Sequence, residues 1–531
     1  MFFIVFFVFF TGNLSCLNIV VNDGQNTYMY MKTFFQRYKG DYHPRKDIQY
    51  DVPLTAQTIK DVFTDCSDLE ARDVYIGDKP HGRATVFFID GIVAGGDISE
   101  SVIRPLTIHP QLSEAKTAYK IVDLMMHGAV WSASVKLRCT TDEAIMDLVN
   151  GYAVIVFDSL RTAVCYEAKT SNQRSIAEPS NEKSIKGAKD AFTETIRVNT
   201  SLVRRHLRTP ALKFKTCTVG RKTHTAIAVA YIDGVANPET VGEILRRLDE
   251  IDIDGVISSG SLEEYISDSI ISPIPQIMNT ERPDRFAMNL LEGRIGIIVD
   301  GLPLGWLIPA TIAQMLKVPE DKAQHFLIAS ALTMLRYIAL FMSVLLPAVY
   351  VAVAMYHQEM IPTKLLISTI ASKQQVPFST AAEILGMLIA FELLQEAGLR
   401  LPNPVSDTVS IIGALIVGQS AIEANVISPI AVIVVAAAGI AGYTIPNQDL
   451  GSAIRLFRFS LVLAAMAVGI YGLMLLLLLI LYHMCTLESF GVAYMSPLAT
   501  RGVFSSILRL PLKLEKYRDP ELRTPDKRNQ A

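Results

Sequence analysis

Four polar side chains in the apolar second half of the sequence could form a path for ions. Glu392 and Glu396 are four residues apart and would stack on one face of a helix, and Gln419 and Glu423 repeat this spacing. A charge inside a bilayer costs about 2.5 to 3.5 kcal/mol on insertion scales, so these carboxylates must face water, a cation or an arginine. Acidic side chains line many cation pores, which makes the four residues candidates for an ion path.

Other placements of these charges are also consistent with the sequence. Glu396 and Glu423 could mark helix ends at the membrane surface, where water would solvate them. The first apolar stretch carries a single charge, Arg336, which we expect to pair with one of the carboxylates rather than to face lipid. Glu383, three residues after Thr380, forms a capping box that would place it at a helix start.

Signatures of catalysis are missing from the sequence, which contains no HExxH, GxSxG, Walker loop or glycine-rich dinucleotide fingerprint. The six cysteines include no CxxC pair, and no histidine stands at the spacing of a zinc site. We therefore expect neither an enzyme nor a bound metal or other cofactor.

Long apolar runs predict a bundle of membrane-spanning helices at residues 326–485. The 531-residue chain is 50% hydrophobic, and nearly all of its long apolar runs fall in this part. A span needs about 20 mostly apolar residues. Residues 327–356, 426–445 and 459–481 meet this requirement, while residues 380–398 and 408–423 are less certain because of their carboxylates. The sequence thus predicts four or five spans.

The sequence leaves open whether the N-terminal residues are a targeting signal and on which side of the membrane the C-terminus lies. Residues 1–50 begin with the apolar run MFFIVFFVFF, which suits a signal-peptide core but lacks a preceding basic residue, so Met31 is an alternative start. Residues 486–531 form a basic tail with eight Lys or Arg against five acids, which favours a cytoplasmic C-terminus. Arg455 and Arg458, which we place in the loop before the last span, would favour the cytoplasmic side for that loop instead.

The first half of the sequence contains two similar units. Residues 84–92 and 226–235 each form a buried type of strand that ends in Ile-Asp-Gly and leads into a helix. Strands that alternate with helices indicate α/β layers. We expect two α/β subdomains, at residues 51–170 and 187–275, joined by a polar linker at residues 171–186. Asp90 and Asp233 could face a ligand, although a strand-ending turn also explains them.

A basic run at residues 204–222 contains seven Lys or Arg and no acid. No nucleic-acid motif accompanies it, so we expect no nucleic-acid partner. In a membrane protein such a run could face anionic lipid or an acidic partner. A solvated surface is the alternative.

Residues 276–325 are expected to form a helix-hairpin adapter between the soluble region and the bundle. Pro283 suits the first turn of a helix, Asp284 suits its dipole, and Gly293 ends it. Two strands then follow around a turn at Asp300 and Gly301. A rigid adapter of this kind would couple a sensing domain to a bundle. The candidate coupling residues are Glu281, Arg282, Pro283, Asp284, Arg285, Glu292, Gly293, Arg294, Asp300 and Gly301. The expected fold is therefore an α/β N-terminal soluble region of two subdomains followed by an all-α multipass membrane bundle.

Several motifs of this sequence resemble those of the GerA family, the A subunits of bacterial spore germinant receptors. They lie in order at residues 96–101 (GDISES), 187–205, 280–285 (TERPDR), 290–294 (LLEGR), 299–301 (VDG), 361–365 (IPTKL), 396–400 (EAGLR), 411–415 (IIGAL) and 489–491 (SFG). The resemblance covers the chain from about residue 74 to its C-terminus, and the first seventy residues fall outside it.

The resemblance implies a multipass protein of the spore inner membrane with a cytoplasmic N-terminal region. It also implies a transporter-like B subunit and a lipoprotein C subunit as partners, and a homo-oligomer in membrane lipid that gates ion release at germination. A second hypothesis keeps the fold but makes the chain an accessory, non-channel scaffold, of the kind represented by stage V sporulation protein AF. A substrate-coupled transporter is disfavoured because the spans contain no inverted repeat.

Overall fold

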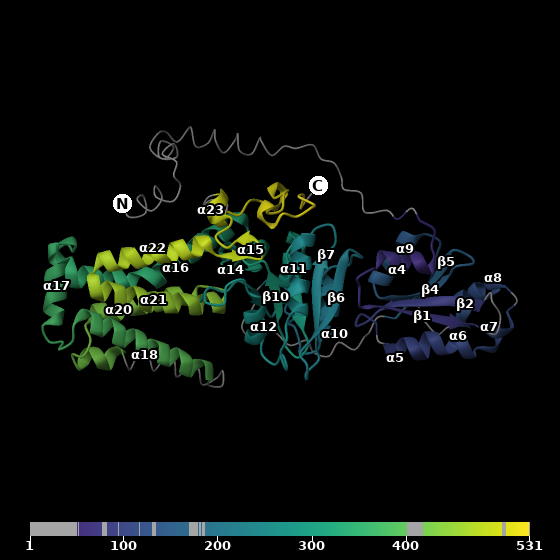
Figure 1. The fold of residues 1–531 in the computed structure, drawn as a ribbon, viewed down its shortest axis with the longest axis horizontal. Coiled ribbons are helices and arrows are strands. Elements are labelled where there is room, and N and C mark those ends of the chain that lie inside the picture. The colour runs from purple at the N-terminus through teal and green to yellow at the C-terminus, as the bar shows by residue number, and fades with distance from the viewer. Residues whose placement is uncertain are drawn as a thin grey trace, which may run out of the picture.

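The computed structural model describes residues 50, 52–76, 82–93, 95–115, 117–129, 134–168, 179, 182, 186–400, 418–501 and 506–529. Most of the expected extension at residues 1–50, most of the linker at residues 171–186 and the first part of the possible span at residues 408–423 lie outside these ranges. The molecule is elongated, with one sheet at one end, a second sheet in the middle and a helical bundle at the other end (Figure 1).

The first subdomain is a five-stranded sheet in the order β1-β2-β4-β5-β3, and each pairing of its strands is antiparallel. Its strands are β1 (Leu69–Tyr75), β2 (Arg83–Ile89), β3 (Val135–Arg138), β4 (Tyr152–Phe157) and β5 (Thr162–Glu167). Its helices are α4 (Ala56–Val62), α5 (Gly95–Ile98), α6 (Arg104–Ile108), α7 (Pro110–Glu114), α8 (Ala118–Leu124) and α9 (Thr141–Val149), with π-helical turns η3 (Ser99–Ile103) and η4 (Met125–Ala129). Every residue of β4 is buried, as expected for a central strand covered on both faces.

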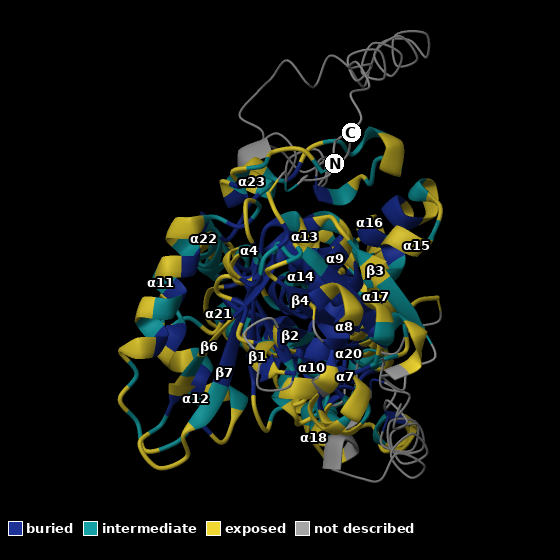
Figure 2. Cartoon of the chain, turned by 90° about the vertical axis from the view of Figure 1, so that its right-hand side faces the viewer, coloured by how far each residue is buried: buried dark blue, intermediate teal, exposed yellow. Residues whose placement is uncertain are grey.

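The second sheet repeats this topology, because its order β6-β7-β9-β10-β8 matches the first sheet strand for strand. Its strands are β6 (Leu212–Val219), β7 (Thr225–Ile232), β8 (Met278–Thr280), β9 (Ile295–Val299) and β10 (Gly305–Ile308), and its helices are α10 (Ile196–His206), α11 (Pro238–Asp249), α12 (Ser259–Ile266) and α13 (Pro283–Glu292). Strands β2 and β7, which both lead into Ile-Asp-Gly turns, occupy the same place in the two sheets. Figure 2 shows buried residues gathered inside the molecule and mostly exposed residues along the outer face of α11.

The adapter is part of the second sheet. The expected helix is α13 and the expected hairpin is β9 and β10, so these elements are present. However, β9 pairs with β7, with Val229 opposite Ile297, and β10 pairs with β8 at the edge. The boundary expected near residue 275 therefore cuts through one sheet, because the subdomain needs the adapter strands to complete it.

Several basic side chains of residues 204–222 bind carboxylates or carbonyls within the chain. Arg204 is completely buried and binds both carboxylate oxygens of Asp68 in the first subdomain, at 2.8 and 2.9 Å. Burial raises the pKa of the Asp68 carboxyl, although Arg204 opposes this effect. Lys213 donates to a backbone carbonyl of the first subdomain, and Lys222 lies 2.8 Å from Asp254. This part of the run therefore stabilises the soluble region.

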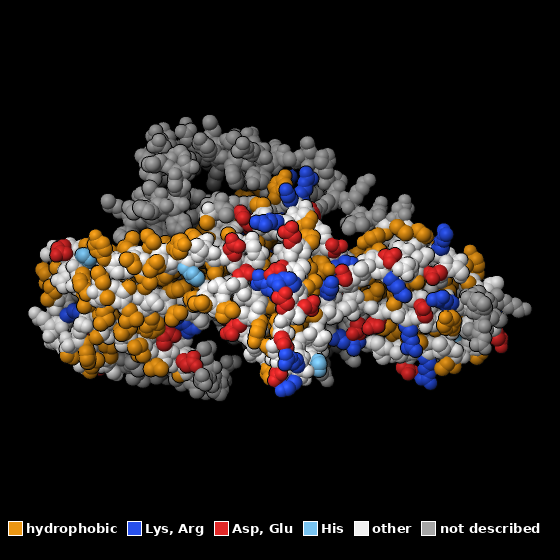
Figure 3. All heavy atoms as spheres, in the orientation of Figure 1, with side chains coloured by type: hydrophobic (Ala, Val, Ile, Leu, Met, Phe, Trp, Pro, Cys, Tyr) orange, Lys and Arg blue, Asp and Glu red, His pale blue; other side chains and the backbone are white. Residues whose placement is uncertain are grey.

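The second half of the chain forms a helical bundle whose surface is largely apolar (Figure 3). Its helices are α16 (Phe326–Tyr356), α17 (Thr363–Lys373), α18 (Thr380–Arg400), α20 (Pro429–Tyr443), α21 (Gln448–Val468) and α22 (Ile470–Thr486), with a short 3-10 turn η5 (Gln358–Met360). Among the described residues, α16 and α21 are long and apolar enough to cross a membrane, and α20 and α22 are apolar but shorter.

The span expected at residues 459–481 is wrong, because this stretch contains the end of one helix and the start of another. Helix α21 ends at Gly469, whose φ of 65° and ψ of −141° break the helix. Helix α22 then returns beside α21 (Figure 1), so closely that a Cβ on Gly472 would lie 2.3 Å from the Ala464 carbonyl oxygen. A hydropathy pattern does not detect such a reversal because both arms are apolar.

A single hydrophobic core joins the second sheet to the base of the bundle. It contains Phe286 of α13, Met315 of α14 (Ile312–Met315), Tyr337 of α16, and Leu450 and Ile454 of α21. Close-packed cores transmit displacement because they contain few voids. The soluble region and the bundle are thus joined by packed side chains as well as by the chain itself.

The C-terminal residues also pack onto this junction, where the sequence predicted a basic tail. They form β11 (Glu488–Ser489), β12 (Val492–Ala493), α23 (Leu498–Arg501) and the 3-10 turns η6 (Leu512–Leu514) and η7 (Pro520–Leu522). Ser489 accepts from the Ala310 amide at 3.1 Å and donates to the Gln276 carbonyl at 2.8 Å. Tyr494 is fully buried, and its carbonyl accepts from the Ile312 amide.

Candidate functional site at the junction

Local sequence signals set the start and the end of α13, the central helix of the junction between the second sheet and the bundle. Pro283 occupies its first turn, and Gly293 ends it with a φ of 101°, which residues with a Cβ rarely adopt. The tip of the Phe286 ring points at β9, so that a Cβ on Gly296 would lie 2.0 Å from the Cζ atom of the ring. Glycine at this position therefore lets the helix approach the sheet closely.

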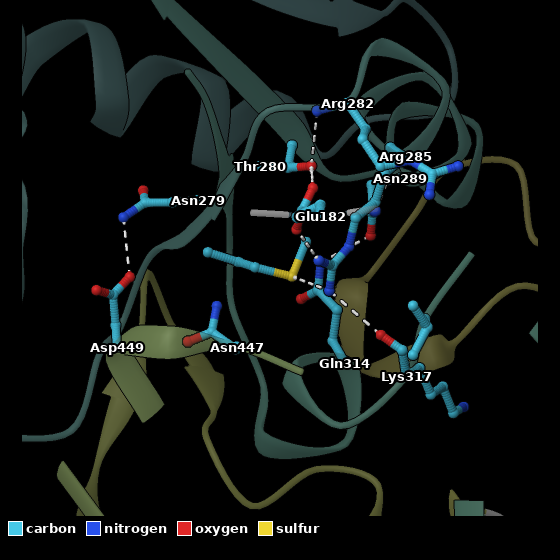
Figure 4. Close-up of polar contacts among 12 residues, drawn as sticks. Glu182, Asn279, Thr280, Arg282, Arg285, Asn289, Gln314, Lys317, Asn447 and Asp449 are labelled. Atoms are coloured by element: carbon cyan, nitrogen blue, oxygen red, sulfur yellow. Dashed lines mark hydrogen bonds and ion pairs between the residues drawn. The ribbon is translucent and has the colours of Figure 1, made fainter. Parts of the chain in front are cut away.

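Buried arginines at the start of α13 are balanced by carboxylates. Arg282 binds Asp284 through two contacts, at 2.7 and 3.0 Å. Arg285 pairs with Glu182, and Glu182 also accepts from the Thr280 hydroxyl at 2.6 Å (Figure 4). Glu182 belongs to the expected linker between the subdomains, so one linker residue forms part of the junction. Truncating one partner of such a pair would leave a buried charge, which typically costs 3 to 5 kcal/mol.

Further hydrogen bonds, to both side chains and backbone carbonyls, extend this network towards the bundle. Arg285 donates to the Lys317 carbonyl at 3.2 Å, and Gln314 of α14 donates to Asn289 of α13 at 2.7 Å. The Glu281 carbonyl accepts from the Phe192 amide at 2.8 Å. Figure 4 shows Arg285, Asn289, Gln314 and Lys317 lying close together.

The end of α13 carries a second charged group of adapter residues. Glu292 lies 2.7 Å from Lys322 of α15 (Glu320–Ala323). Burial opposes ionisation of Glu292, but Lys322 and Arg294 bring the pKa of its carboxyl below the ordinary value. Arg294 is buried and donates to the Pro309 carbonyl, and burial lowers the pKa of its guanidinium.

The adapter hairpin also holds α10, the helix next to the first subdomain. The Asp300 carboxylate accepts from the Ile196 amide at 3.0 Å, and the Gly301 amide donates to the Glu194 carbonyl at 2.7 Å. A carboxylate at this position satisfies an unpaired amide at a helix start and is favoured by the helix dipole. Because Arg204 of α10 binds the first subdomain, the hairpin is linked to both sheets.

Arg336 pairs with the soluble side of the junction, so the ion pair expected inside the membrane is wrong. Its guanidinium binds both oxygens of Asp321 in α15, at 2.6 and 2.9 Å, and donates to the Leu316 carbonyl at 3.3 Å. The physical reason is the length of α16. Its 31 residues extend for about 46 Å, more than the roughly 30 Å that a bilayer core requires, and Arg336 in its first half pairs with α15.

A polar contact joins the second sheet to the start of α21. Asn279 of β8 donates to Asp449 at 3.0 Å, as Figure 4 shows. Glu263 of α12 also lies near this carboxylate. Burial, with a smaller contribution from Asp449, raises the pKa of Glu263 to about 7. This carboxyl would therefore change its ionisation near neutral pH.

Glu392 faces two arginines of α21. Its carboxylate lies 2.7 Å from Arg458 and 3.4 Å from Arg455. Arginine was one of the neighbours expected for this carboxylate, but the sequence had placed both arginines in a loop. Helix α21 starts earlier, at Gln448, because the Asn447 side chain caps it by accepting from the backbone at 2.8 Å.

The other candidate ion-path residues lie on exposed surface. Gln419 donates to Glu423 at 3.2 Å on the helical residues 418–423, and both side chains are exposed. Glu396 is exposed one turn after Glu392 on α18. The structure thus brings Gln419 and Glu423 together and directs Glu392 to the arginines.

Glu383 caps a neighbouring helix instead of its own. Its carboxylate is buried and accepts from the Ser428 amide, just before α20, at 2.9 Å, and Lys373 lies 3.5 Å away. Glu383 does lie in the first turn of α18, as predicted, but the capping box with Thr380 is wrong, because the Ser379 hydroxyl accepts from the Ala382 amide at 3.3 Å. In the part of the chain that the structure describes, no three His, Cys, Asp or Glu side chains are placed to hold a metal ion.

A family model described as the Bacillus/Clostridium GerA spore germination protein matches residues 57–521. The chain belongs to the GerA family. Spore germination protein KA of Bacillus subtilis (strain 168) is 38% identical to this GerA protein over 90% of the chain and 87% of the relative. Uncharacterized membrane protein YfkQ of the same strain is 37% identical over 87% of the chain and 86% of the relative. Spore germination protein GerLA of Bacillus cereus is 33% identical over 88% of the chain and 95% of the relative.

A solved structure also matches this GerA protein. It is the crystal structure of the N-terminal domain of the A subunit of the Bacillus megaterium spore germinant receptor GerK3, which is 30% identical. The match covers 50% of this chain and 99% of that chain, with a TM-score of 0.39.

Sequence reasoning missed Asp321, Asp449 and Glu182 as junction residues of this GerA protein. Glu182 and Asp449 lie at least 98 residues from their partners, and Asp321 is 15 residues from Arg336 on a separate helix, so no local pattern indicates these contacts. Arg458 did carry a signal, because Asn447 is a strong helix-capping residue ahead of a long apolar helix. Starting the helix at that cap would have placed Arg455 and Arg458 inside α21 and not in a loop.

Proposed function

We propose that this GerA protein is the A subunit of a spore nutrient germinant receptor, a multipass membrane protein that gates ion release when germination begins. The observation that carries the proposal is the shared core, in which Phe286 of the adapter and Tyr337 of α16 belong to one packed unit. A displacement of the second sheet would then move the base of the bundle. Similarity to spore germination proteins over most of the chain supports the biological setting.

The proposed complex contains several copies of this chain, a transporter-like B subunit that binds the nutrient and a lipoprotein C subunit, in the lipid of the spore inner membrane. The soluble region lies on the cytoplasmic side and has no enzymatic activity. We place the ion path between copies, lined by Glu396, Gln419 and Glu423, whose side chains are exposed on the protomer. Glu392 then contributes to the bundle through its arginine pairs.

One observation favours the alternative of a non-channel scaffold. Glu392 is bound by Arg455 and Arg458, so this expected path residue is already balanced within the protomer. Conduction distinguishes the two proposals. Full-length protein reconstituted with its B and C subunits in liposomes should pass monovalent cations when nutrient is added, and Glu423→Gln should alter the conductance or ion selectivity. A tight bilayer under every condition would favour the scaffold.

Coupling through α13 is tested by Pro283→Gly, with Pro238→Gly as the matched control. Both prolines occupy the first turn of a helix, but Pro283 starts the junction helix and Pro238 starts α11 on the outer surface of the second sheet. We expect Pro283→Gly spores to respond poorly to nutrient at normal protein levels, because a looser α13 transmits less displacement. Equal nutrient responses in the two variants, or loss of Pro283→Gly protein from the membrane, would contradict the coupling role.

A further inference from the structure

Two adjacent isoleucines project from the loop at residues 267–277, between α12 and β8. Ile270 is 74% exposed and Ile271 is 96% exposed. Single exposed apolar residues are common on protein surfaces and need no explanation. This pair differs because of how its loop is held and where the loop lies.

The base of the loop is held firmly. The buried Gln276 side chain accepts from the amides of Asp268 and Ser269, both at 3.0 Å, and donates to the Ser269 carbonyl at 2.8 Å. Asp268 also binds Arg247 at 2.6 Å and accepts from the Phe490 amide at 2.6 Å. The backbone on either side of the isoleucines is therefore fixed, and the tip is held outward.

The same loop touches the end of an apolar bundle helix. Ser272 lies 2.9 Å from the His483 ring nitrogen in the last turns of α22. Its neighbour Tyr482 is 67% exposed, and Leu478, one turn earlier, is also exposed. Tyrosine is enriched where a membrane helix meets the headgroups. Helix α12 lies on the side of the second sheet that faces the bundle (Figure 1).

We propose that Ile270 and Ile271 insert into the interfacial layer of the bilayer beside α22, so that the soluble region contacts the membrane directly. This inference rests on the proposed membrane placement of the bundle. Lipid fits better than a protein partner because the loop contacts the last turns of α22, where Tyr482 and Leu478 are exposed. Two residues are also far fewer than the 20 to 30 on each side of a standard protein interface.

Tryptophan fluorescence in vesicles of phosphatidylcholine with brominated acyl chains tests the proposal, because bromine quenches only nearby tryptophans. Full-length Ile271→Trp should lose emission relative to unbrominated vesicles, after subtraction of the two native tryptophans. Its emission maximum should also lie at shorter wavelength than that of Ile108→Trp. Ile108 is an exposed isoleucine at the end of α6, a helix of the first subdomain that lies far from the bundle (Figure 1), and its variant should not be quenched.

Leu478→Trp, on the exposed face of α22, separates the two levels of the proposal. Quenching of Leu478→Trp without quenching of Ile271→Trp overturns the membrane contact and leaves the bundle in the bilayer. Absence of quenching at both positions overturns the membrane placement as well. A shift of Ile271→Trp to shorter wavelength without bromine quenching means that a second copy or another protein covers the tip, which also overturns the lipid contact.

Discussion

Replacing Glu392 with glutamine is expected to lower the free energy of unfolding by roughly 3 to 5 kcal/mol. Arg458 is 2% exposed and lies 2.7 Å from this carboxylate, so the neutral amide would remove the charge that balances a buried guanidinium. Arg455 is 30% exposed and can reach water, so its lost contact at 3.4 Å adds at most about 1 kcal/mol.

Thermal unfolding of the purified full-length protein in lipid nanodiscs measures this effect. Glu392→Gln and Arg458→Gln should each unfold at clearly lower temperature than the unmodified protein, while Arg455→Gln should change little. The double variant Glu392→Gln/Arg458→Gln should recover most of the loss, because replacing both members of a buried ion pair is often nearly neutral. Glu423→Gln is the matched control, since its side chain is exposed and its removal should leave stability unchanged.

An unchanged unfolding temperature for Glu392→Gln, together with an altered ion selectivity, would refute this reasoning. Glu392 would then face a hydrated path and contribute to conduction. Additive losses in the double variant would likewise show that Glu392 and Arg458 act independently, because paired residues give non-additive changes.

Three other changes test the junction. Glu263→Gln should stabilise the protein by about 3 kcal/mol at pH 8 and by less than about 1 kcal/mol at pH 5. Because the pKa of Glu263 is raised from 4.5 to about 7, its ionisation weakens the folded state progressively as pH rises above 4.5. Unfolding curves of the variant and the unmodified protein that keep the same separation from pH 5 to 8 would contradict this. Gly293→Ala should cost about 1 to 3 kcal/mol, because φ is 101° and the new Cβ would lie 2.3 Å from the Thr524 methyl carbon; Thr524→Ala in the same chain should restore part of the loss, measured by thermal unfolding. Asp321→Asn should cost roughly 3 to 5 kcal/mol by leaving Arg336 without its carboxylate, seen as lower membrane abundance; normal abundance and melting would argue against this pair.

Local signals in the sequence were sufficient to predict the adapter. Pro283, Gly293 and the Asp300–Gly301 turn each restrict the backbone within a few residues, so the helix and hairpin could be predicted without tertiary information. The place of this hairpin in the sheet could not be predicted in the same way. Pairing of β9 with β7 joins residues about seventy positions apart, and several sheets satisfy the same strand pattern.

Charge pairing in the bundle was harder to predict because each partner lies on another helix. The spacing of Glu392 and Glu396 correctly predicted that the Glu392 carboxylate needs a neighbour to balance its charge, and arginine was among the expected neighbours. The identity of that neighbour depends on the reversal at Gly469 and on the early start of α21, which together set where Arg458 lies. Arg336 failed as a prediction because hydropathy gives no measure of how far a helix extends beyond the lipid.

Helix α16 behaves mechanically as a rod with one soft joint. It runs without interruption from the buried ring of Tyr337 to Tyr356, whose hydroxyl donates to the Met466 carbonyl at 2.7 Å, near the reversal between α21 and α22. Pro347 lies within it and has no amide to donate, so bending is easiest there. A twist applied at the soluble end must therefore reappear at the opposite end of the bundle, unless this proline absorbs it.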